Sequence, residues 1–200
     1  MTKREINHIP YDKLKKYIED ESMTESLMER ADEIRRANYG NKVYIRGLIE
    51  VSNICKNNCY YCGIRRSNDH VNRYRLAKDE ILRSADFGYG LGFRTFVMQG
   101  GEDPSFSRDF VVDSIREIKN KYPDTAITLS LGERSYEDYK AFYDAGADRY
   151  LLRQETSNPD HYAKIHPKEM SLAHRQECLY NLKEIGYQVG GGFMVDSPYQ

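Results

Sequence analysis

Short apolar runs alternate with longer amphipathic segments through most of this 200-residue chain. The apolar runs are expected to form strands at 43–51, 93–99, 126–131, 150–153 and 188–194. Helices are expected between them at 77–89, 109–121, 136–145 and 172–185, the last with Ser171 as N-cap and Gly186 as terminator. Such an alternation predicts an α/β fold in which right-handed crossovers join parallel strands. A doubly wound sheet and a (β/α) barrel both fit it.

The residues that follow the expected strands favour the barrel. In (β/α) barrels the functional groups gather in the loops at the carboxyl ends of the strands. Those loops carry here the cysteines of 55–62, the segment 99–103, Ser130 with Glu133, and Arg153 with Glu155. A complete barrel takes about 250 residues, whereas this chain stops at Gln200, directly after its fifth expected strand. We therefore predict a TIM-type barrel, present as an N-terminal part of about five βα units and truncated at the C-terminus.

The first part of the chain has a different pattern. A helix is expected at 24–40, with Thr24 as N-cap, Gly40 just past its end, and Leu27, Ala31 and Ile34 on one face. This helix precedes the first expected strand and should pack outside the main sheet. We therefore assign residues 1–42 to an N-terminal helical extension and residues 43–200 to the barrel domain.

Charge and hydropathy exclude several classes of partner. The chain has 30 basic and 31 acidic residues and no basic run of the kind that binds a phosphate backbone, so nucleic acid is not expected as a partner. No segment approaches the roughly 20 apolar residues that a membrane span needs, and the N-terminus lacks the apolar core of a signal peptide. The protein is therefore expected in the cytoplasm, where a reducing environment keeps thiolates free for metal.

Three of the four cysteines, Cys55, Cys59 and Cys62, lie within eight positions in a C-x3-C-x2-C arrangement. They are too close in sequence to link distant parts of a secreted fold and are interpreted as metal ligands. Three thiolates can hold three corners of a [4Fe-4S] cluster, which leaves one iron for a substrate or cofactor. A zinc site completed by His70 is the alternative, but structural zinc sites usually have a second ligand pair further along, which is absent here.

Other candidate residues lie near the expected strand ends. Gly100 and Gly101 would let the backbone approach a ligand closely and Glu102 can accept from an amine, although a tight turn also explains this tripeptide. Arg153 and Glu155 should share one strand face, where they would meet a ligand or pair with each other. Arg175 should lie near the buried side of its helix, where a guanidinium can bind a carboxylate.

Three residues and one glycine run are given less specific roles. His161 and His166 flank a polar segment and are predicted to be surface residues without a function. Cys178 stands alone in the last helix and is expected to be a small core residue. The run 190–192 either lets the backbone approach a ligand or forms a tight bend.

Several of these features together resemble the radical S-adenosylmethionine (SAM) superfamily. An aromatic residue, here Tyr61, directly precedes the last cysteine of the motif, and a Gly-Gly-Glu segment follows the second strand. The resemblance implies that the amino and carboxylate groups of SAM chelate the fourth iron of a [4Fe-4S] cluster. An electron from the cluster then splits a carbon–sulfur bond of SAM and releases a 5′-deoxyadenosyl radical. The residues implied near the cofactor are Tyr61, Gly100, Gly101, Glu102, Thr128, Ser130, Arg153, Glu155 and Arg175.

Within that superfamily, the phrases Cys62-Gly-Ile-Arg-Arg66 and Tyr150-Leu-Leu-Arg-Gln-Glu-Thr156 resemble the HydE family of [FeFe]-hydrogenase maturases. The resemblance implies an anaerobic enzyme that helps assemble the diiron subsite of the hydrogenase cluster. Its substrate would be a small molecule or an organometallic iron precursor, its partners the maturases HydG and HydF, and an electron donor would be needed. Asp196 departs from the family, which usually has glycine there. Methylornithine synthase (PylB), biotin synthase and a non-catalytic metal-binding scaffold are the alternatives.

Overall fold

The computed structural model describes residues 9–200 of the chain, which form two compact units divided between Tyr44 and Ile45. The expected boundary between residues 42 and 43 stays a prediction. In the described part of the chain, none of the helices has the length and apolar character required to cross a membrane.

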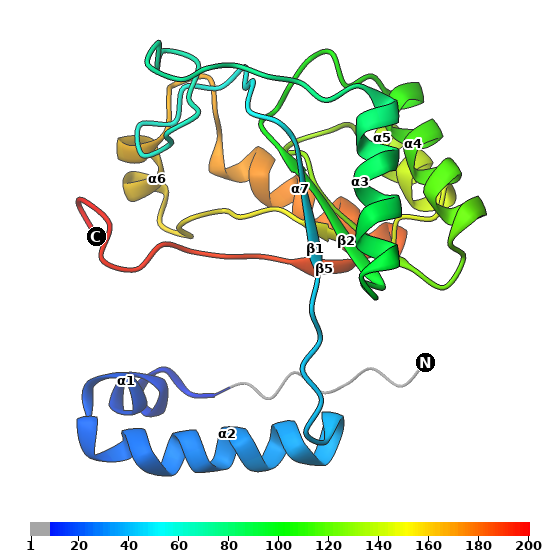
Figure 1. Ribbon diagram of the computed structural model, residues 1–200. Helices are drawn as coiled ribbons and strands as arrows, with labels where there is room; N and C mark the ends of the chain where they lie inside the picture. The colour runs from blue at the N-terminus through cyan, green and yellow to red at the C-terminus, as the bar shows by residue number, and fades with distance from the viewer. Residues whose placement is uncertain (1–8) are drawn as a thin grey trace. The chain divides into compact units, whose positions relative to one another are not determined.

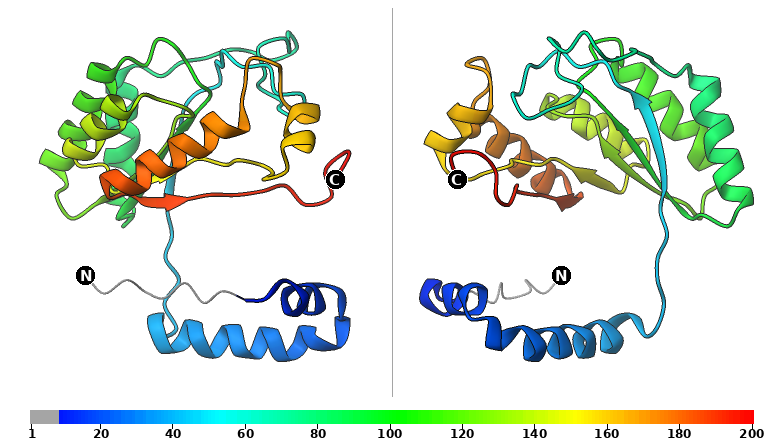
Figure 2. Two further views of the ribbon diagram at one scale, coloured as in Figure 1. Left: turned by 180° about the vertical axis from the view of Figure 1, so that it is seen from behind. Right: turned by 60° about the vertical axis from the view of Figure 1, so that its left-hand side comes forward.

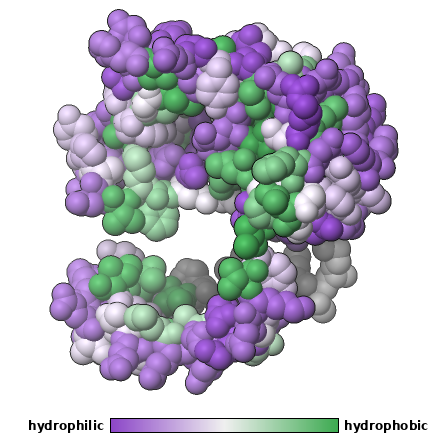
Figure 3. Space-filling view, in the orientation of Figure 1, coloured by the Kyte–Doolittle hydropathy of each residue, from purple (hydrophilic) through white to green (hydrophobic). Residues whose placement is uncertain are grey.

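The first unit consists of helices α1 (Tyr11–Glu19) and α2 (Thr24–Tyr39), joined by the 3₁₀ turn η1 (Glu21–Met23). The prediction of Thr24 as N-cap was wrong. Asp20 caps the 3₁₀ turn by accepting from the Ser22 N–H, so the backbone is already helical when it reaches Thr24. Gly40 ends α2 with φ +61°, as predicted. Neither helix has a fully buried side chain, and apolar side chains stay exposed on this unit (Figure 3).

The second unit contains one five-stranded parallel sheet in the order β1-β2-β3-β4-β5, which confirms the predicted α/β class. Each strand pairs with its neighbour in the sequence, as in part of a (β/α) barrel. The strands are β1 (Gly47–Ser52), β2 (Thr95–Gly100), β3 (Ala126–Ser130), β4 (Arg149–Leu151) and β5 (Gln188–Gly190). Because all five are parallel, their carboxyl ends lie along one rim of the sheet.

Five helices follow the strands in this unit: α3 (Lys78–Gly90), α4 (Arg108–Lys121), α5 (Tyr136–Asp144), α6 (Pro159–Ile165) and α7 (Leu172–Ile185). Helices α3, α4, α5 and α7 cover one face of the sheet (Figures 1 and 2). Helix α7 begins after its predicted N-cap Ser171 and ends at Gly186, which has φ +115°. Helix α6 was not predicted, although Asn158 caps it and Pro159 occupies its first turn.

Alternation along β3 shows how the sheet separates its core from its other face. Ile127 and Leu129 are fully buried together with Ile115 and Ile118 of α4. Thr128 lies between them in sequence and therefore points to the opposite face, on which no helix of this unit packs in Figures 1 and 2. The helices thus provide an apolar core on one side, and polar side chains remain on the other side and at the rim.

Candidate functional site

Cys55, Cys59 and Cys62 lie in the loop that follows β1, and all three are free and partly buried. Burial, together with the neighbouring Cys55 and Cys62, raises the pKa of the Cys59 thiol to about 11. Burial also raises the pKa of the Cys55 thiol. Negative charge on these two sulfurs is therefore unfavourable without a cation beside them. This donor set fits an iron–sulfur cluster, whose iron ions supply that positive charge and prefer thiolate ligands.

A single zinc ion does not fit the same loop. The side chain of His70 is 94% exposed and lies beside Asp69. Among residues 9–200, no three His, Cys, Asp or Glu side chains converge closely enough to bind one metal ion. The exposed His70 therefore does not complete a zinc site with the three cysteines in the described residues.

The segment after β2 packs directly against the cysteine loop. The Gly101 N–H donates to the Ser52 carbonyl at 3.1 Å, and the Lys56 N–H donates to the Glu102 carbonyl at 3.0 Å. A Cβ atom at Gly101 would overlap the Ile54 carbonyl oxygen and come within 2.8 Å of the Cys55 Cβ. The φ of Gly101 is not positive, so backbone conformation does not require a glycine here. The close approach of the two segments does require it. A tight turn alone does not account for it.

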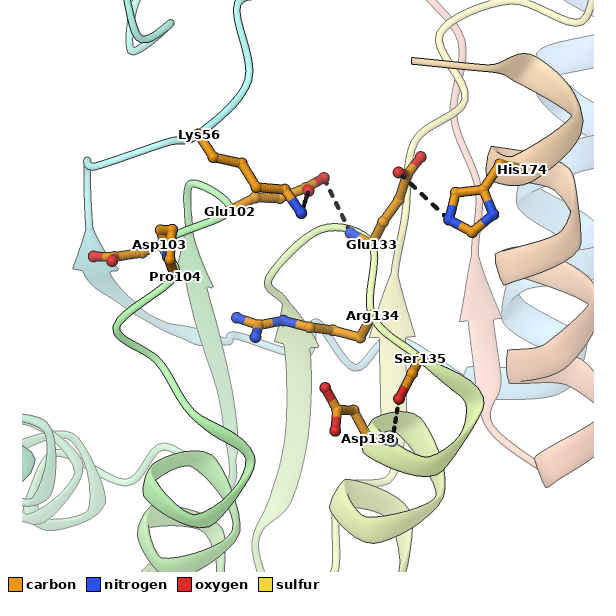
Figure 4. Close-up of a pocket in the computed structure, with 9 residues that line it drawn as sticks. All are labelled: Lys56, Glu102, Asp103, Pro104, Glu133, Arg134, Ser135, Asp138 and His174. Carbon is orange, nitrogen blue, oxygen red and sulfur yellow. Dashed lines mark hydrogen bonds and ion pairs between the residues drawn. The ribbon is translucent and has the colours of Figure 1, made fainter. Parts of the chain in front are cut away.

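Glu102, Glu133 and Arg175 form a buried charged cluster beside this segment. The Glu133 N–H donates to Glu102 Oε1 at 3.0 Å. Arg175 places Nε 2.8 Å from Glu133 Oε1 and Nη2 3.7 Å from Glu102 Oε1. Figure 4 shows both carboxylates facing a rim pocket of about 470 Å³, with Lys56 and His174 beside them. Arg175 lies in the buried position predicted for it, but both of the carboxylates it contacts belong to the protein itself.

Two carboxylates share one guanidinium in this cluster, and this sharing shifts the pKa values of Glu133 and Arg175. Burial raises the pKa of the Glu133 carboxyl; Arg175 opposes the rise and Glu102 adds to it. Burial alone would lower the pKa of Arg175, but Glu133 and Glu102 together raise it above its usual value. Arg175 is therefore a fixed positive charge between two acids.

Replacing Arg175 with methionine is expected to lower the free energy of unfolding by about 3–5 kcal/mol, because two buried carboxylates lose their shared counter-charge. Urea unfolding of the two proteins at neutral pH measures this difference. Arg116→Met on the exposed side of α4 is the matched control and should change stability by less than about 0.5 kcal/mol. Equal losses in both variants would show that the cluster does not need Arg175.

A second cavity, of about 460 Å³, connects the cysteine loop with the polar face of the sheet. Its lining includes Cys62, Gly100, Ser130 and Arg153. Thr128 precedes Ser130 on the same face, and its buried Oγ1 has no hydrogen-bond partner in residues 9–200. The structure therefore brings three of the predicted cofactor residues, Gly100, Ser130 and Arg153, to one cavity beside Cys62. A ligand in this region can satisfy polar groups that the protein leaves unpaired.

Arg153 and Glu155 are not placed by strand alternation, because β4 already ends at Leu151. Glu155 has φ +64°, a left-handed conformation that is unfavourable for glutamate by roughly 1–2 kcal/mol. Burial raises the pKa of its carboxyl, and Arg153 and Arg175 partly offset the rise. No ion pair joins Arg153 to Glu155 in the part of the chain that the structure describes. Of the two alternatives for these residues, the mutual pair is therefore not found in the described residues, and contact with a ligand stays a prediction.

In the glycine run 190–192, Gly192 lies against a side chain of the protein itself, and its two predicted roles stay predictions. A Cβ atom there would lie 3.2 Å from Arg153 Cγ, so this glycine lets the Arg153 side chain pack against the backbone.

Asp196, where the resemblance leads us to expect glycine, has φ +58°. Glycine adopts this conformation freely, and aspartate is one of the few other residues that tolerate it.

The prediction that His161 and His166 are surface residues was wrong. They are 5% and 3% exposed, because the unpredicted helix α6 folds them inward. His161 Nε2 lies 2.9 Å from the Pro198 carbonyl oxygen. His166 Nδ1 lies 3.1 Å from the Tyr162 carbonyl oxygen, and its Nε2 lies 3.1 Å from Tyr61 Oη. A carbonyl only accepts, so Nδ1 carries the proton and Nε2 accepts from Tyr61.

Unfolding free energy should fall as the pH drops from 6.5 toward 4, because burial lowers the pKa of His166 to about 4. In that range the unfolded chain binds a proton at this residue that the folded protein does not, so stability rises with pH. His166→Gln should reduce the slope by at most about 1.4 kcal/mol per pH unit, the value for one proton. Urea unfolding at several pH values measures the slope, with the exposed His70→Gln as control. An unchanged slope in His166→Gln would contradict the assignment.

Asp103 and Arg75 are two structural residues of the site that sequence reasoning missed. Asp103 is 1% exposed and accepts from Ser52 Oγ at 2.7 Å. Arg75 donates to both oxygens of Asp103, each at 2.7 Å. This bidentate pair ties the end of β1 to the end of β2.

Cys178 is 1% exposed and is the core residue that was predicted.

Two solved structures have the same arrangement of strands and helices. The methylornithine synthase PylB superposes with a TM-score of 0.78 and 28% identity, over 88% of this chain and 52% of PylB. The [FeFe]-hydrogenase maturase HydG superposes with a TM-score of 0.77 and 29% identity, over 88% of this chain and 41% of HydG.

Sequence comparison finds relatives of the same kind. The chain is 46% identical over 183 residues to the [FeFe]-hydrogenase maturase subunit HydE of Thermotoga maritima, which covers 92% of this chain and 52% of that protein. It thus spans about half the length of the curated relatives it matches. Residues 49–198 match the Radical SAM superfamily, whose members use a [4Fe-4S] cluster and SAM. With the cysteine motif at the rim of a parallel α/β sheet, this match shows that the chain belongs to the radical SAM superfamily.

Proposed function

We propose that this chain provides the cluster-binding part of a radical SAM enzyme of the HydE type. The observation that carries the proposal is the contact between the loop of Cys55, Cys59 and Cys62 and the Gly101–Glu102 segment, beside a cavity lined by Cys62, Ser130 and Arg153. In this proposal the three thiolates bind three irons of a [4Fe-4S] cluster. When bound, the cluster and SAM supply reductive cleavage of a carbon–sulfur bond of SAM, which gives a 5′-deoxyadenosyl radical.

The protein residues bind and orient the cofactor in this proposal. Tyr61, held by its hydrogen bond to His166, presents an aromatic ring beside Cys62. Glu102 accepts from the amino group of SAM, and Arg175 binds its carboxylate while remaining close to Glu133. The unpaired hydroxyl of Thr128 supports a polar ligand on this face of the sheet. The full set near the cofactor is Tyr61, Gly100, Gly101, Glu102, Thr128, Ser130, Arg153, Glu155 and Arg175.

We infer that the complete protein acts in assembly of the diiron subsite of [FeFe]-hydrogenase. Support comes from the 46% identity to HydE of Thermotoga maritima. The proposal includes a small-molecule or organometallic iron substrate, the maturases HydG and HydF as partners, an electron donor, and a cytoplasmic location. Methylornithine synthesis is the second candidate, because the PylB structure superposes with a TM-score of 0.78. A biotin-synthase-like activity is the third.

A maturation assay with the full reading frame tests this substrate assignment. Inactive hydrogenase is incubated anaerobically with HydF, HydG, SAM and a reductant, with and without the protein, and hydrogen evolution is measured. Activity that appears only with the protein, and is lost in its Cys59→Ser variant, supports the HydE-type function. Formation of methylornithine or of biotin, without hydrogenase activation, would instead support one of the other two activities.

A further inference from the structure

The loop that carries the three cysteines contains no helix or strand between the end of β1 and the short bridge at Arg75. Its backbone carbonyls therefore accept no hydrogen bonds from the N–H groups of a helix or sheet. Each needs another donor, from a side chain, a loop N–H or water. One side chain, that of Arg73, supplies donors to four of them. Sequence patterns gave no indication of this role, because Arg73 is one of several basic residues in a polar stretch.

The guanidinium of Arg73 reaches both ends of the cysteine loop. Its Nη1 donates to the Asn53 carbonyl at 2.5 Å and to the Ile64 carbonyl at 2.9 Å. Its Nη2 donates to the Arg65 carbonyl at 2.8 Å and to the Asn68 carbonyl at 2.9 Å. Asn53 lies two residues before Cys55, and Ile64 lies two residues after Cys62. One rigid group thus joins the entry of the cysteine loop to its exit.

A second set of contacts fixes Arg73 itself. The Asn53 side chain donates to the Asn72 carbonyl at 2.8 Å and accepts from the Tyr74 N–H at 2.8 Å. Arg75 then pairs with Ser52 in an antiparallel bridge. The residues on both sides of Arg73 are therefore held against the end of β1. Because the backbone at Arg73 is already fixed, less conformational freedom is lost when the guanidinium binds the loop carbonyls.

A side chain that binds all four carbonyls must have the right shape as well as a positive charge. Guanidinium is planar and presents five N–H donors in a fixed fork, whereas the lysine ammonium is a compact charge with three donors on a flexible stem. A lysine at residue 73 can reach one or two of these carbonyls but does not reproduce the pattern. Hydrogen bonds from a charged donor are also stronger than neutral ones.

We propose that Arg73 is a positioning residue for the cluster site: it closes the cysteine loop by binding the carbonyls of Asn53, Ile64, Arg65 and Asn68. This role rests on the proposed function insofar as the three cysteines hold the cluster. In this proposal the closed loop forms before iron binds and presents Cys55 and Cys62 at a preset separation. Preformed ligand positions increase retention of a bound metal centre.

The test compares Arg73→Lys and Arg73→Met with wild type, and uses Arg66→Gln, an exposed arginine on the same loop, as the matched control. Hydrogen–deuterium exchange of the iron-free proteins should be roughly tenfold faster in residues 54–72 of both Arg73 variants. Exchange in β2 and β3 should not change, because those strands do not depend on the guanidinium. After reconstitution, iron release to a chelator should be roughly tenfold faster in both variants, and Arg66→Gln should match wild type.

Three results would overturn the proposal. One is unchanged exchange in residues 54–72, and another is faster exchange spread equally over the sheet, which would make Arg73 a general stability residue. The third is wild-type behaviour of Arg73→Lys, which would show that charge alone is sufficient. If wild type itself binds no iron, the cluster assignment fails, whereas the exchange rates of the iron-free proteins still decide whether Arg73 closes the loop.

Discussion

Cys59→Ser is expected to abolish stable iron binding while leaving the iron-free protein folded. Wild type should bind about four irons per chain after anaerobic reconstitution, and the variant should retain less than about a tenth of that. A serine hydroxyl stays protonated at neutral pH and is a poor ligand for iron that prefers thiolate. Cys59 is in a loop and only partly buried, so its loss should change the free energy of unfolding by less than about 1 kcal/mol. Iron content and urea unfolding are measured on the same preparations.

Cys178→Ser is the matched control, because it makes the same chemical change at a buried core position. It should retain the iron and lose about 1–3 kcal/mol of stability, since it buries a hydroxyl in place of a thiol. The two variants are thus expected to show opposite patterns. Iron retention in Cys59→Ser, or iron loss in Cys178→Ser at unchanged stability, would contradict the assignment of the ligands.

Gly101→Ala is expected to disrupt both stability and iron binding. The added methyl group would overlap the Ile54 carbonyl oxygen and press on the Cys55 Cβ, and neither neighbour is the end of a flexible side chain. The backbone of the cysteine loop must therefore move. We expect a loss of roughly 2–4 kcal/mol in the free energy of unfolding and a clear fall in iron content, because Cys55 is displaced.

Gly63→Ala provides the comparison, since no atom lies within 4 Å of a Cβ atom at that position. It also follows a cysteine of the same loop, yet it should change stability by less than about 0.5 kcal/mol and leave iron content at the wild-type value. Urea unfolding and iron analysis report both effects. Equal behaviour of the two alanine variants would show that the contact between the Gly101 segment and the loop is not needed.

Local patterns predicted the elements whose signals lie within one segment. The apolar spacing of 172–185, Ser171 before it and Gly186 after it predicted α7 to the residue. The strands were placed correctly but were too long, because β5 ends at Gly190 and the exposed residues 43–45 precede β1. Helix α6 is too short for its periodicity to be recognised, and missing it led to the wrong placement of His161 and His166.

Parts of the site that depend on distant residues could not be predicted in the same way. The motif of Cys55, Cys59 and Cys62 could be recognised because its spacing is local. The pair of Asp103 with Arg75 joins residues 28 positions apart, and the pair of Arg175 with Glu133 joins helix α7 to the loop after β3. The contacts of Arg73 depend on the path of an irregular loop, for which the sequence contains no periodic signal.

SAM cleavage shows whether this chain holds a radical SAM cluster. The protein is reconstituted anaerobically with iron and sulfide, reduced, mixed with SAM, and analysed by chromatography for 5′-deoxyadenosine, with Cys59→Ser treated in parallel. We expect about four irons per chain, and 5′-deoxyadenosine formation that depends on both the reductant and Cys59. One zinc per chain in place of iron, with no 5′-deoxyadenosine above the level of the Cys59→Ser protein, would contradict this expectation.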